Sequence, residues 1–301
     1  MTWPNLKITC TQSGSVITVA QPAYVIGLYG DAALCEFGDT ALRSWLRMLP
    51  ADRDVWYLGE QSRQFRVMDA RALARIFASL SNAKQRSQFY VLKVGPGFAV
   101  SQHSLEMNLG MSASSGAADR LHIAAPVDYP DLDGPEAAVN AFQDWVEKLP
   151  VQHATAGYGF DLSWGREWEM VAMPQIMAAG RRFLAIEVRN RLTEIKLLNK
   201  LLSPAWLTYL RSDMIKMLGG DTRFGGKFDS DVKVIQCRDG VILRAGEKPP
   251  IGDTNRRATD LGPLKQVYRV VKPLCLNEWF ATQLFRIEAS DANAWFARLE
   301  Q

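Results

Sequence analysis

The most acidic stretch of this chain reads D-Y-P-D-L-D-G-P-E and places Asp128, Asp131 and Asp133 close enough to share a loop. Asp229 and Asp231 form a second pair of carboxylates. Paired carboxylates can catalyse glycoside hydrolysis or bind a hard cation. The first group lacks the D-x-D-x-D-G spacing of a calcium loop, and Asp133 also fits the start of a helix. Three interpretations stay open: a helix-capping loop, an acidic patch that binds a partner, and a catalytic or metal site.

Other motifs for catalysis or cofactor binding are missing. The chain has no H-E-x-x-H, no Walker loop and no G-x-G-x-x-G after a strand. His103, His122 and His153 are 19 and 31 residues apart, so none has a second histidine about three to five residues away. The Gly/Ser-rich loop at residues 110–116 misses the nucleophile elbow, because Ser114 stands where that motif needs Gly. We therefore expect no catalytic residue, no metal and no cofactor. A site assembled from distant residues is the enzymatic alternative.

Two further groups of residues fit either structure or recognition. A loop with the pattern P-x-x-G-D-x-N contains Asp253 and Asn255 and is followed by Arg256. Pro and Gly shape such a turn, and Asp and Asn can accept hydrogen bonds from local N–H groups, but ordered loops also carry binding sites. Trp164 and Trp168 present the same choice, because Trp is enriched at interface hot spots and also covers cores.

Length and composition indicate an ordinary globular protein. The chain has 301 residues, 48% of them apolar, and a formal net charge of +3. Neither the basic stripe of a nucleic-acid binder nor the acidic excess of a DNA mimic is present. The four cysteines form no C-x-x-C pair, so reduced thiols are expected. The first residues do not read as a signal peptide, and no run of ~18 apolar residues could span a bilayer, so a cytoplasmic protein is expected.

Periodicity and turn residues predict short strands with helices between them. Helices are expected to begin near residues 40, 69, 135, 264 and 290, with Asp69 as a cap and Pro135 at a first helical position. Strands are expected at residues 15–20, 23–29, 55–58, 64–67, 89–94, 104–109, 121–125, 154–163, 183–188, 232–237 and 241–245. Asp-Gly between the last two is a strong hairpin signal.

This order of elements predicts an α+β fold, with mostly antiparallel sheet covered by helices. A single domain over residues 1–301 is the simplest organisation. The helix–strand groups of the two halves look loosely alike, which leaves open two similar halves with a sub-boundary near residue 150.

The most complete helix signal covers residues 203–220. Ser203 can cap the first turn, and Pro204 fits the first helical position. Leu207 and Leu210 begin an apolar face at helical spacing, and Gly219 supplies a left-handed residue to end the helix. The sequence therefore predicts one long amphipathic core helix here.

Several motifs follow one another over residues 154–276: a Pro-capped segment with W-L-T and a closing Gly-Gly, a strand pair, P-x-x-G-D-x-N, and Y-R-x-V-x-x-L. In this order they resemble the type VI secretion immunity family associated with VRR-type nuclease effectors, formerly a domain family of unknown function. The motifs read as structural, so they indicate a family more than a mechanism.

The resemblance implies a protein that is not an enzyme and that binds a cognate type VI effector toxin, of nuclease class, in the cytoplasm and occludes its active site. An acidic loop suits the basic cleft of a nuclease. The expected contact residues are Asp128, Asp131, Asp133, Trp164, Trp168, Asp253, Asn255 and Arg256. No direct nucleic-acid or membrane partner is expected, and the oligomeric state is left open.

The net charge leaves a question, because immunity proteins against nucleases are often acidic. Either charge is segregated into patches on this chain, or the target is not a nuclease. The alternative function is a hydrolase with a site assembled from distant carboxylates, and a third is an adaptor or structural subunit of a secretion apparatus.

Overall fold

The computed structural model describes residues 6–12, 14–50, 53–59, 64–81, 87–95, 99–101, 103–112, 117–163, 166–189, 197–220, 224, 228–256, 260–277 and 289–300. The strands are β1 (Ile8–Gln12), β2 (Ser15–Gly30), β3 (Val55–Gly59), β4 (Arg66–Val67), β5 (Gln88–Val94), β6 (Ser104–Leu109), β7 (Asp119–Ala125), β8 (His153–Leu162), β9 (Leu207–Arg211), β10 (Val232–Cys237) and β11 (Gly240–Ala245). The helices are η1 (Leu34–Phe37), α1 (Gly38–Met48), α2 (Ala70–Leu80), α4 (Tyr129–Leu132), α5 (Pro135–Lys148), α6 (Arg166–Arg182), α7 (Ser212–Met217), α8 (Gly262–Val271), η4 (Lys272–Leu274) and α9 (Ala289–Ala297).

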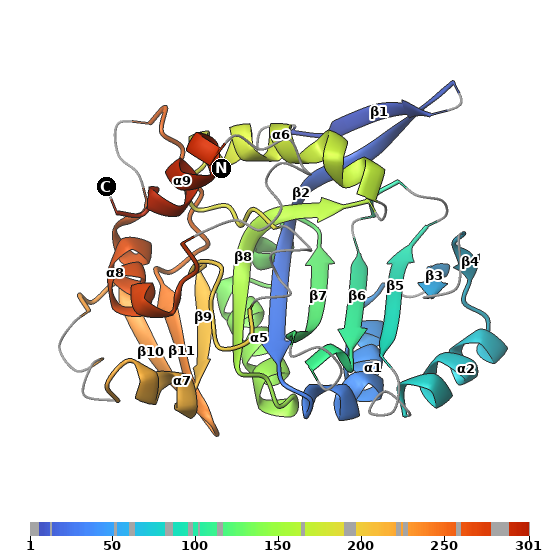
Figure 1. Ribbon diagram of the computed structural model, residues 1–301, viewed down its shortest axis with the longest axis horizontal. Helices are drawn as coiled ribbons and strands as arrows, with labels where there is room; N and C mark the ends of the chain where they lie inside the picture. Colours follow the sequence, from blue (N-terminus) through green and yellow to red (C-terminus); the bar gives the residue numbers. More distant parts are fainter. Residues whose placement is uncertain are drawn as a thin grey trace.

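The strands form one eleven-stranded sheet in the order β10-β11-β9-β8-β2-β7-β6-β5-β3-β4, with β1 paired to the first part of β2 (Figure 1). Every pairing between these strands is antiparallel, which confirms the predicted α+β fold. β2 and β8 pair from Ala20↔Leu162 to Tyr29↔His153, so segments on both sides of residue 150 belong to the same sheet. The division into one or two domains stays a prediction.

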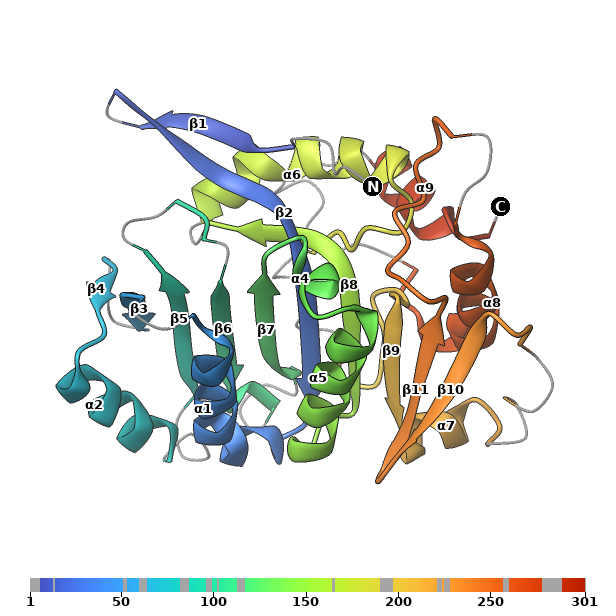
Figure 2. The ribbon, with the colours of Figure 1, turned by 180° about the vertical axis from the view of Figure 1, so that it is seen from behind.

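Helices cover both faces of the sheet. On the face seen in Figure 2, α1 and α5 bury Trp45 and Phe142 in a cluster that includes Leu28 of β2. On the other face, α6 packs on β1, β2 and β8, and α8 packs on β10 and β11 (Figure 1). The predicted inward residues of α5 are all buried: Val139, Phe142, Trp145, Val146 and Leu149. The predicted cap of α2 is also confirmed, because the Asp69 carboxylate accepts a hydrogen bond from Ala72 N–H at 2.6 Å.

The single helix predicted from Pro204 onward is wrong. The chain there forms strand β9, which pairs with β8 on one side and β11 on the other, and only then the short helix α7. Leu207 and Tyr209 pack in the cluster beneath α5, whereas Leu210 packs in the cluster beneath α8. A strand buried on both faces reads as a continuous apolar run, which periodicity cannot tell from a buried helix.

The predicted end of this segment is confirmed. Gly219 has a φ of +98° and directly follows the last turn of α7. Its N–H donates to Lys216 O, and Gly220 N–H donates to Ile215 O, each at 3.0 Å. These two bonds form a Schellman motif, which needs a left-handed residue at its centre.

Residues 15–20 and 23–29 form one long strand, so the predicted break at Pro22 is wrong. In the described residues, β1 pairs with β2 only as far as Ala20, and β7 pairs with it only from Tyr24. Pro22 lies in the gap and has a partner only on the other side, Phe160 of β8. A residue without an N–H is tolerated where one edge of a strand is unpaired.

The strand predicted over residues 183–188 is also wrong. Phe183 makes an isolated bridge to Asp253, and a turn follows. The next two N–H groups, of Leu184 and Ala185, donate to Gly252 O and Ile251 O. The segment therefore bonds mainly to a loop, and Glu187 N–H makes a single bond to the sheet, at Tyr158 O of β8.

Gly240 begins β11 directly after the hairpin turn, where β9 runs alongside. A Cβ atom at this position would lie 2.2 Å from the carbonyl oxygen of Leu210. The backbone of the neighbouring strand thus leaves no room for a side chain.

We predict that Gly240→Ala lowers the free energy of unfolding by about 1–3 kcal/mol, because β9 or β11 must shift to make room. Gly262→Ala is the matched control, since a Cβ there meets nothing within 4 Å. Urea denaturation measures both variants. Equal midpoints for Gly240→Ala and the wild type would contradict this packing.

His153 is a core histidine. Its side chain is buried in β8, its Nε2–H donates to Leu197 O at 2.7 Å, and its ring stacks on Tyr29 with centroids 4.8 Å apart. Burial lowers the pKa of His153 from 6.5 to about 4, although the bond to Leu197 opposes this shift. The folded protein therefore favours the neutral ring.

A lowered folded-state pKa means that protonation favours unfolding, so His153 costs stability as the pH falls from about 6.5 towards 4. Because the unfolded chain takes up one more proton, the free energy of unfolding falls by up to about 1.4 kcal/mol more for each pH unit of acidification. We predict that His153→Gln, which keeps an N–H donor, has a shallower decline than the wild type over this window. Urea titrations at a series of pH values test this, and parallel profiles would count against it.

Candidate functional site

A cleft of about 890 Å³ opens between α4 and α5 on one side and β10, the end of β11 and the loop after it on the other. Figure 2 shows α4 and α5 on the same face of the molecule, with the β10–β11 hairpin beside them. The register of the sheet brings these segments together, because β9, β8 and β11 are neighbours. The apolar residues of the lining are Val127, Tyr158, Ala245, Pro249, Ile251 and Pro263.

Acidic side chains dominate the polar part of the cleft. Six carboxylates face two ammonium groups, which gives a formal charge of six minus two, or −4, in a chain whose net charge is +3. All eight residues are exposed. Charge is therefore segregated, which was one of the two outcomes that the sequence left open. The residues are Asp128, Asp131, Glu136, Asp231, Glu247 and Asp260, with Lys233 and Lys248.

Two of the three aspartates predicted as a site lie in this cleft. Asp128 and Asp131 line it, and Asp131 lies 3.6 Å from the Lys248 ammonium, with both side chains more than half exposed. Asp133 is exposed nearby but is absent from the lining. Its predicted role as the start of a helix is wrong, because Asp133 ends α4 and the N-cap of α5 is Gly134. Gly134 has a φ of +82°, which the tight turn between the two helices requires.

Arg244 ties the two sides of the cleft together. Its side chain is 2% exposed, and its guanidinium donates to the Glu136 carboxylate at 2.5 Å. The same guanidinium donates to the carbonyl oxygens of Gly246 at 3.2 Å and Glu247 at 2.6 Å. The hydrogen bond from Arg244 lowers the pKa of Glu136. One buried cation thus fixes β11, the following loop and the start of α5 relative to one another.

The P-x-x-G-D-x-N loop is first of all a structural turn. The Asp253 carboxylate accepts hydrogen bonds from Arg182 Nε and Nη2, at 3.1 and 3.3 Å, and these bonds lower its pKa. Asn255 N–H donates to Asp253 at 3.1 Å, and Arg256 approaches the same carboxylate at 3.9 Å. This group holds the end of α6. Within the described residues it lies outside the cleft lining, to which the motif contributes Pro249 and Ile251.

The two predicted tryptophans fall largely outside the described part of the chain. Trp164 lies outside the described residues. The backbone of Trp168 is part of α6, but its side chain is outside the described part of the structure.

Glu136, Glu247 and Asp260 were missed as site residues, and Asp231 was noted only as half of a carboxylate pair. Glu136 ends the same acidic stretch as Asp128, whereas Asp231, Glu247 and Asp260 lie in three other segments. Only the strand pairing places them opposite the first group. Asp260 also has a structural task, because its carboxylate accepts from Ile251 N–H at 3.0 Å and Gly252 N–H at 2.8 Å.

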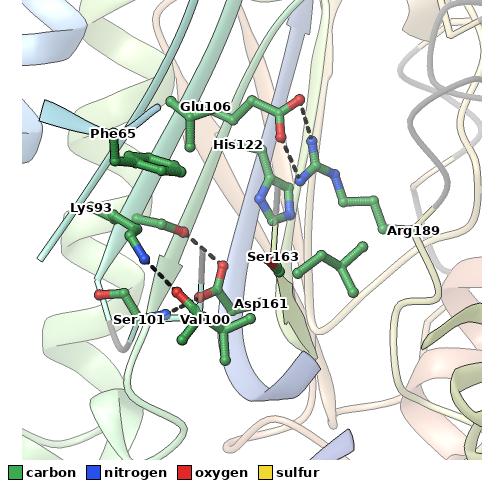
Figure 3. Close-up of a pocket in the computed structure, with 13 residues that line it drawn as sticks. Phe65, Lys93, Val100, Ser101, Glu106, His122, Asp161, Ser163 and Arg189 are labelled. Atoms are coloured by element: carbon green, nitrogen blue, oxygen red, sulfur yellow. Dashed lines mark hydrogen bonds and ion pairs between the residues drawn. The ribbon is translucent and has the colours of Figure 1, made fainter. Parts of the chain in front are cut away.

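A second polar cluster lies on the other face of the sheet (Figure 3). The Asp161 carboxylate of β8 accepts from Ser101 N–H at 3.0 Å and from the Ser104 hydroxyl at 2.8 Å. The Lys93 ammonium donates to Ala99 O, and burial lowers the pKa of Lys93 to about 8. These contacts tie the 99–101 segment to the sheet.

The same cluster contains Arg189, which lies 3.5 Å from the Glu106 carboxylate, and His122 (Figure 3). Distant carboxylates, a lysine and a histidine are thus brought together, as the hydrolase alternative requires. The cavity between them measures about 20 Å³, close to the volume that one water molecule needs. The described residues thus enclose room for about one water molecule, so this cluster does not favour the hydrolase alternative.

Other chemistry is limited within the described part of the chain. There, no three His, Cys, Asp or Glu side chains are grouped as they would be around a metal ion. The four cysteines are free thiols, of which only Cys35 is buried. No described helix is both long and apolar enough to cross a bilayer.

The comparisons with known proteins agree with the fold and the motifs. The family model TsiV, type VI immunity for VRR-NUC, matches residues 51–299. The Pseudomonas aeruginosa T6SS protein PA0821 has a similar structure, with a TM-score of 0.80, 17% sequence identity, and coverage of 98% of this chain and 87% of that one. At this identity the likeness concerns the fold alone. No curated protein matches the sequence.

We predict that Arg244→Met lowers the free energy of unfolding by about 2–4 kcal/mol, because it removes charge-assisted hydrogen bonds from partly buried acceptors. Arg238→Met is the matched control, since Arg238 is exposed in the β10–β11 turn. Thermal and urea denaturation provide the readout. If Arg244→Met lowered the free energy of unfolding no more than Arg238→Met does, the linking role of Arg244 would be contradicted.

Proposed function

The chain belongs to the type VI immunity family for VRR-NUC, and from that premise we propose that it neutralises a nuclease effector by binding it and occluding its active site. Family membership makes this a type VI secretion immunity protein. We propose in addition that the target is a nuclease and that a particular surface of this chain binds it.

The segregated charge of the cleft is the observation that carries the proposal. A nuclease holds DNA phosphates with Lys and Arg side chains, so its substrate cleft is basic. The cleft of this chain offers a formal charge of −4 on exposed side chains. Complementary charge of this kind orients two proteins and accelerates their association. A basic segment of the effector that projects into the cleft would be unable to hold DNA.

Asp128 and Asp131 are the proposed centre of the contact, with Asp133 at its rim. A stable interface buries about 1,200–2,000 Å² in total, so surfaces beyond the cleft must contribute. Asn255 and Arg256 are exposed on the neighbouring loop and stay proposed contacts. Asp253 is engaged with Arg182 and would act mainly by holding that loop in place.

Binding without catalysis, in the cytoplasm, completes the proposal. An effector that cuts DNA acts where the DNA is, so the immunity protein has to meet it there. Inhibition by occlusion requires a rigid complementary surface and no bond-making step. The fixed position of the cleft walls, set by Arg244, suits that requirement.

We predict that the double variant Asp128→Lys/Asp131→Lys weakens binding of a catalytically inactive cognate VRR-type effector by at least about thirtyfold. That factor corresponds to about 2 kcal/mol, a modest value for the reversal of two charges that face a basic surface. Calorimetric titration at physiological salt measures the change. The variant should also fail to protect cells from the active effector.

The double variant Asp39→Lys/Asp144→Lys is the matched control. It makes the same change in net charge at partly exposed aspartates of α1 and α5, outside the cleft. Equal affinities for the two double variants would remove the cleft from the interface. A wild-type protein that binds no such effector would overturn the proposed function itself.

A further inference from the structure

Strand β10 stands at one end of the sheet. Its only strand partner in the described part of the chain is β11, so its outer edge carries no strand there. An open edge of this kind is a template for an added strand.

The hydrogen bonds of β11 show which groups of β10 point outward. Ala245 N–H donates to Trp206 O, on the β9 side, whereas Gly246 N–H donates to Asp231 O, on the β10 side. Because successive residues of a strand alternate in direction, the residues of β11 that bond to β10 are Gly240, Ile242 and Arg244. Their partners in β10 are Cys237, Ile235 and Lys233.

The remaining residues of β10 therefore direct their backbone groups to the open edge. Val232 N–H is already engaged, because it donates to Asp229 O at 3.1 Å. The N–H and C=O groups of Val234 and Gln236 are left facing outward. This spacing, two residues apart, is what an antiparallel partner strand uses.

The side chains of β10 relate this edge to the acidic cleft. Lys233 is exposed and lines the cleft, next to Asp231. Val234 and Gln236 alternate to the opposite face, where Val234 is 36% exposed. A strand added to β10 would thus run directly along one wall of the cleft.

We propose that an extended segment of the effector adds to the outer edge of β10 as a further strand of the sheet, an inference that rests on the proposed function. Backbone hydrogen bonds to Val234 and Gln236 hold the segment, as in other cases of β-strand addition. Cross-strand pairing favours an apolar residue beside Val234 and an acidic or polar residue facing Lys233.

A second copy of this chain is the less suitable occupant. If two β10 strands paired antiparallel with their Val234 residues opposite each other, the two Lys233 side chains would lie diagonally across the pair on the same face of the sheet. Like charges placed so close disfavour the pairing, and edge lysines commonly prevent self-association. The edge is therefore suited to a different chain.

Amide hydrogen exchange of this protein, alone and saturated with the catalytically inactive effector, tests the inference directly. We expect the amides of Val234 and Gln236 to exchange rapidly in the free protein and at least tenfold more slowly in the complex. Unchanged exchange at both amides in a saturated complex would overturn the inference while leaving the proposed function intact. No binding at all would overturn both.

A pair of variants distinguishes the contribution of the Val234 backbone N–H to effector binding from that of its side chain. Val234→Pro removes the outward N–H and is tolerated on an edge strand, whereas Val234→Thr keeps the N–H and the β-branched shape. We expect Val234→Pro to weaken effector binding at least tenfold and Val234→Thr by less than twofold, with circular dichroism unchanged for both. Equal binding by the two folded variants, or a dimer of the free wild type held together through β10, would contradict strand addition by the effector.

Discussion

The pairing of β2 with β8 is the interaction on which the rest of the structure depends. Ten residues of each strand are in register, and the two strands are central in the strand order of the sheet. β2 carries β7, β6 and β5 on one side, and β8 carries β9, β11 and β10 on the other. Because β8 is buried along its whole length, its register cannot slip without moving apolar residues out of the core. The position of the β10–β11 hairpin relative to α5, and hence the width of the cleft, follows from this register.

The cleft shows how charge can be concentrated in a chain that is nearly neutral overall. Its acidic residues come from four separate segments of the chain. Arg244 is placed beneath them, where it bonds Glu136 and two loop carbonyl groups. A buried cation below an exposed acidic surface fixes the walls while the carboxylates above it remain available to a partner. This separation of structural from exposed charge reconciles a slightly basic chain with the proposed binding of a nuclease.

Elements with clear capping or turn residues at their ends could be predicted from the sequence, including β7, β8 and β11, which are buried on both faces. The exception is β9, whose flanking residues resemble the ends of a helix. The helix α2 follows from its Asp69 cap and its apolar spacing, and the β10–β11 hairpin follows from Asp-Gly. Apolar residues also fill both faces of β9, so periodicity did not separate it from a helix. Asp128 and Asp131 could be found as candidates because they are close in the sequence. Glu247 and Asp260 could not, because only the sheet brings them to the same cleft.

The central claim is that the acidic cleft is the surface that grips the effector. Carbodiimide labelling of carboxylates, read by mass spectrometry with and without saturating effector, tests this claim most directly. The account predicts that Asp128, Asp131 and Glu136 lose most of their reactivity in the complex, while Asp144, an exposed residue of α5 that does not line the cleft, keeps its own. Equal labelling of the cleft carboxylates in the free protein and in the saturated complex would contradict it.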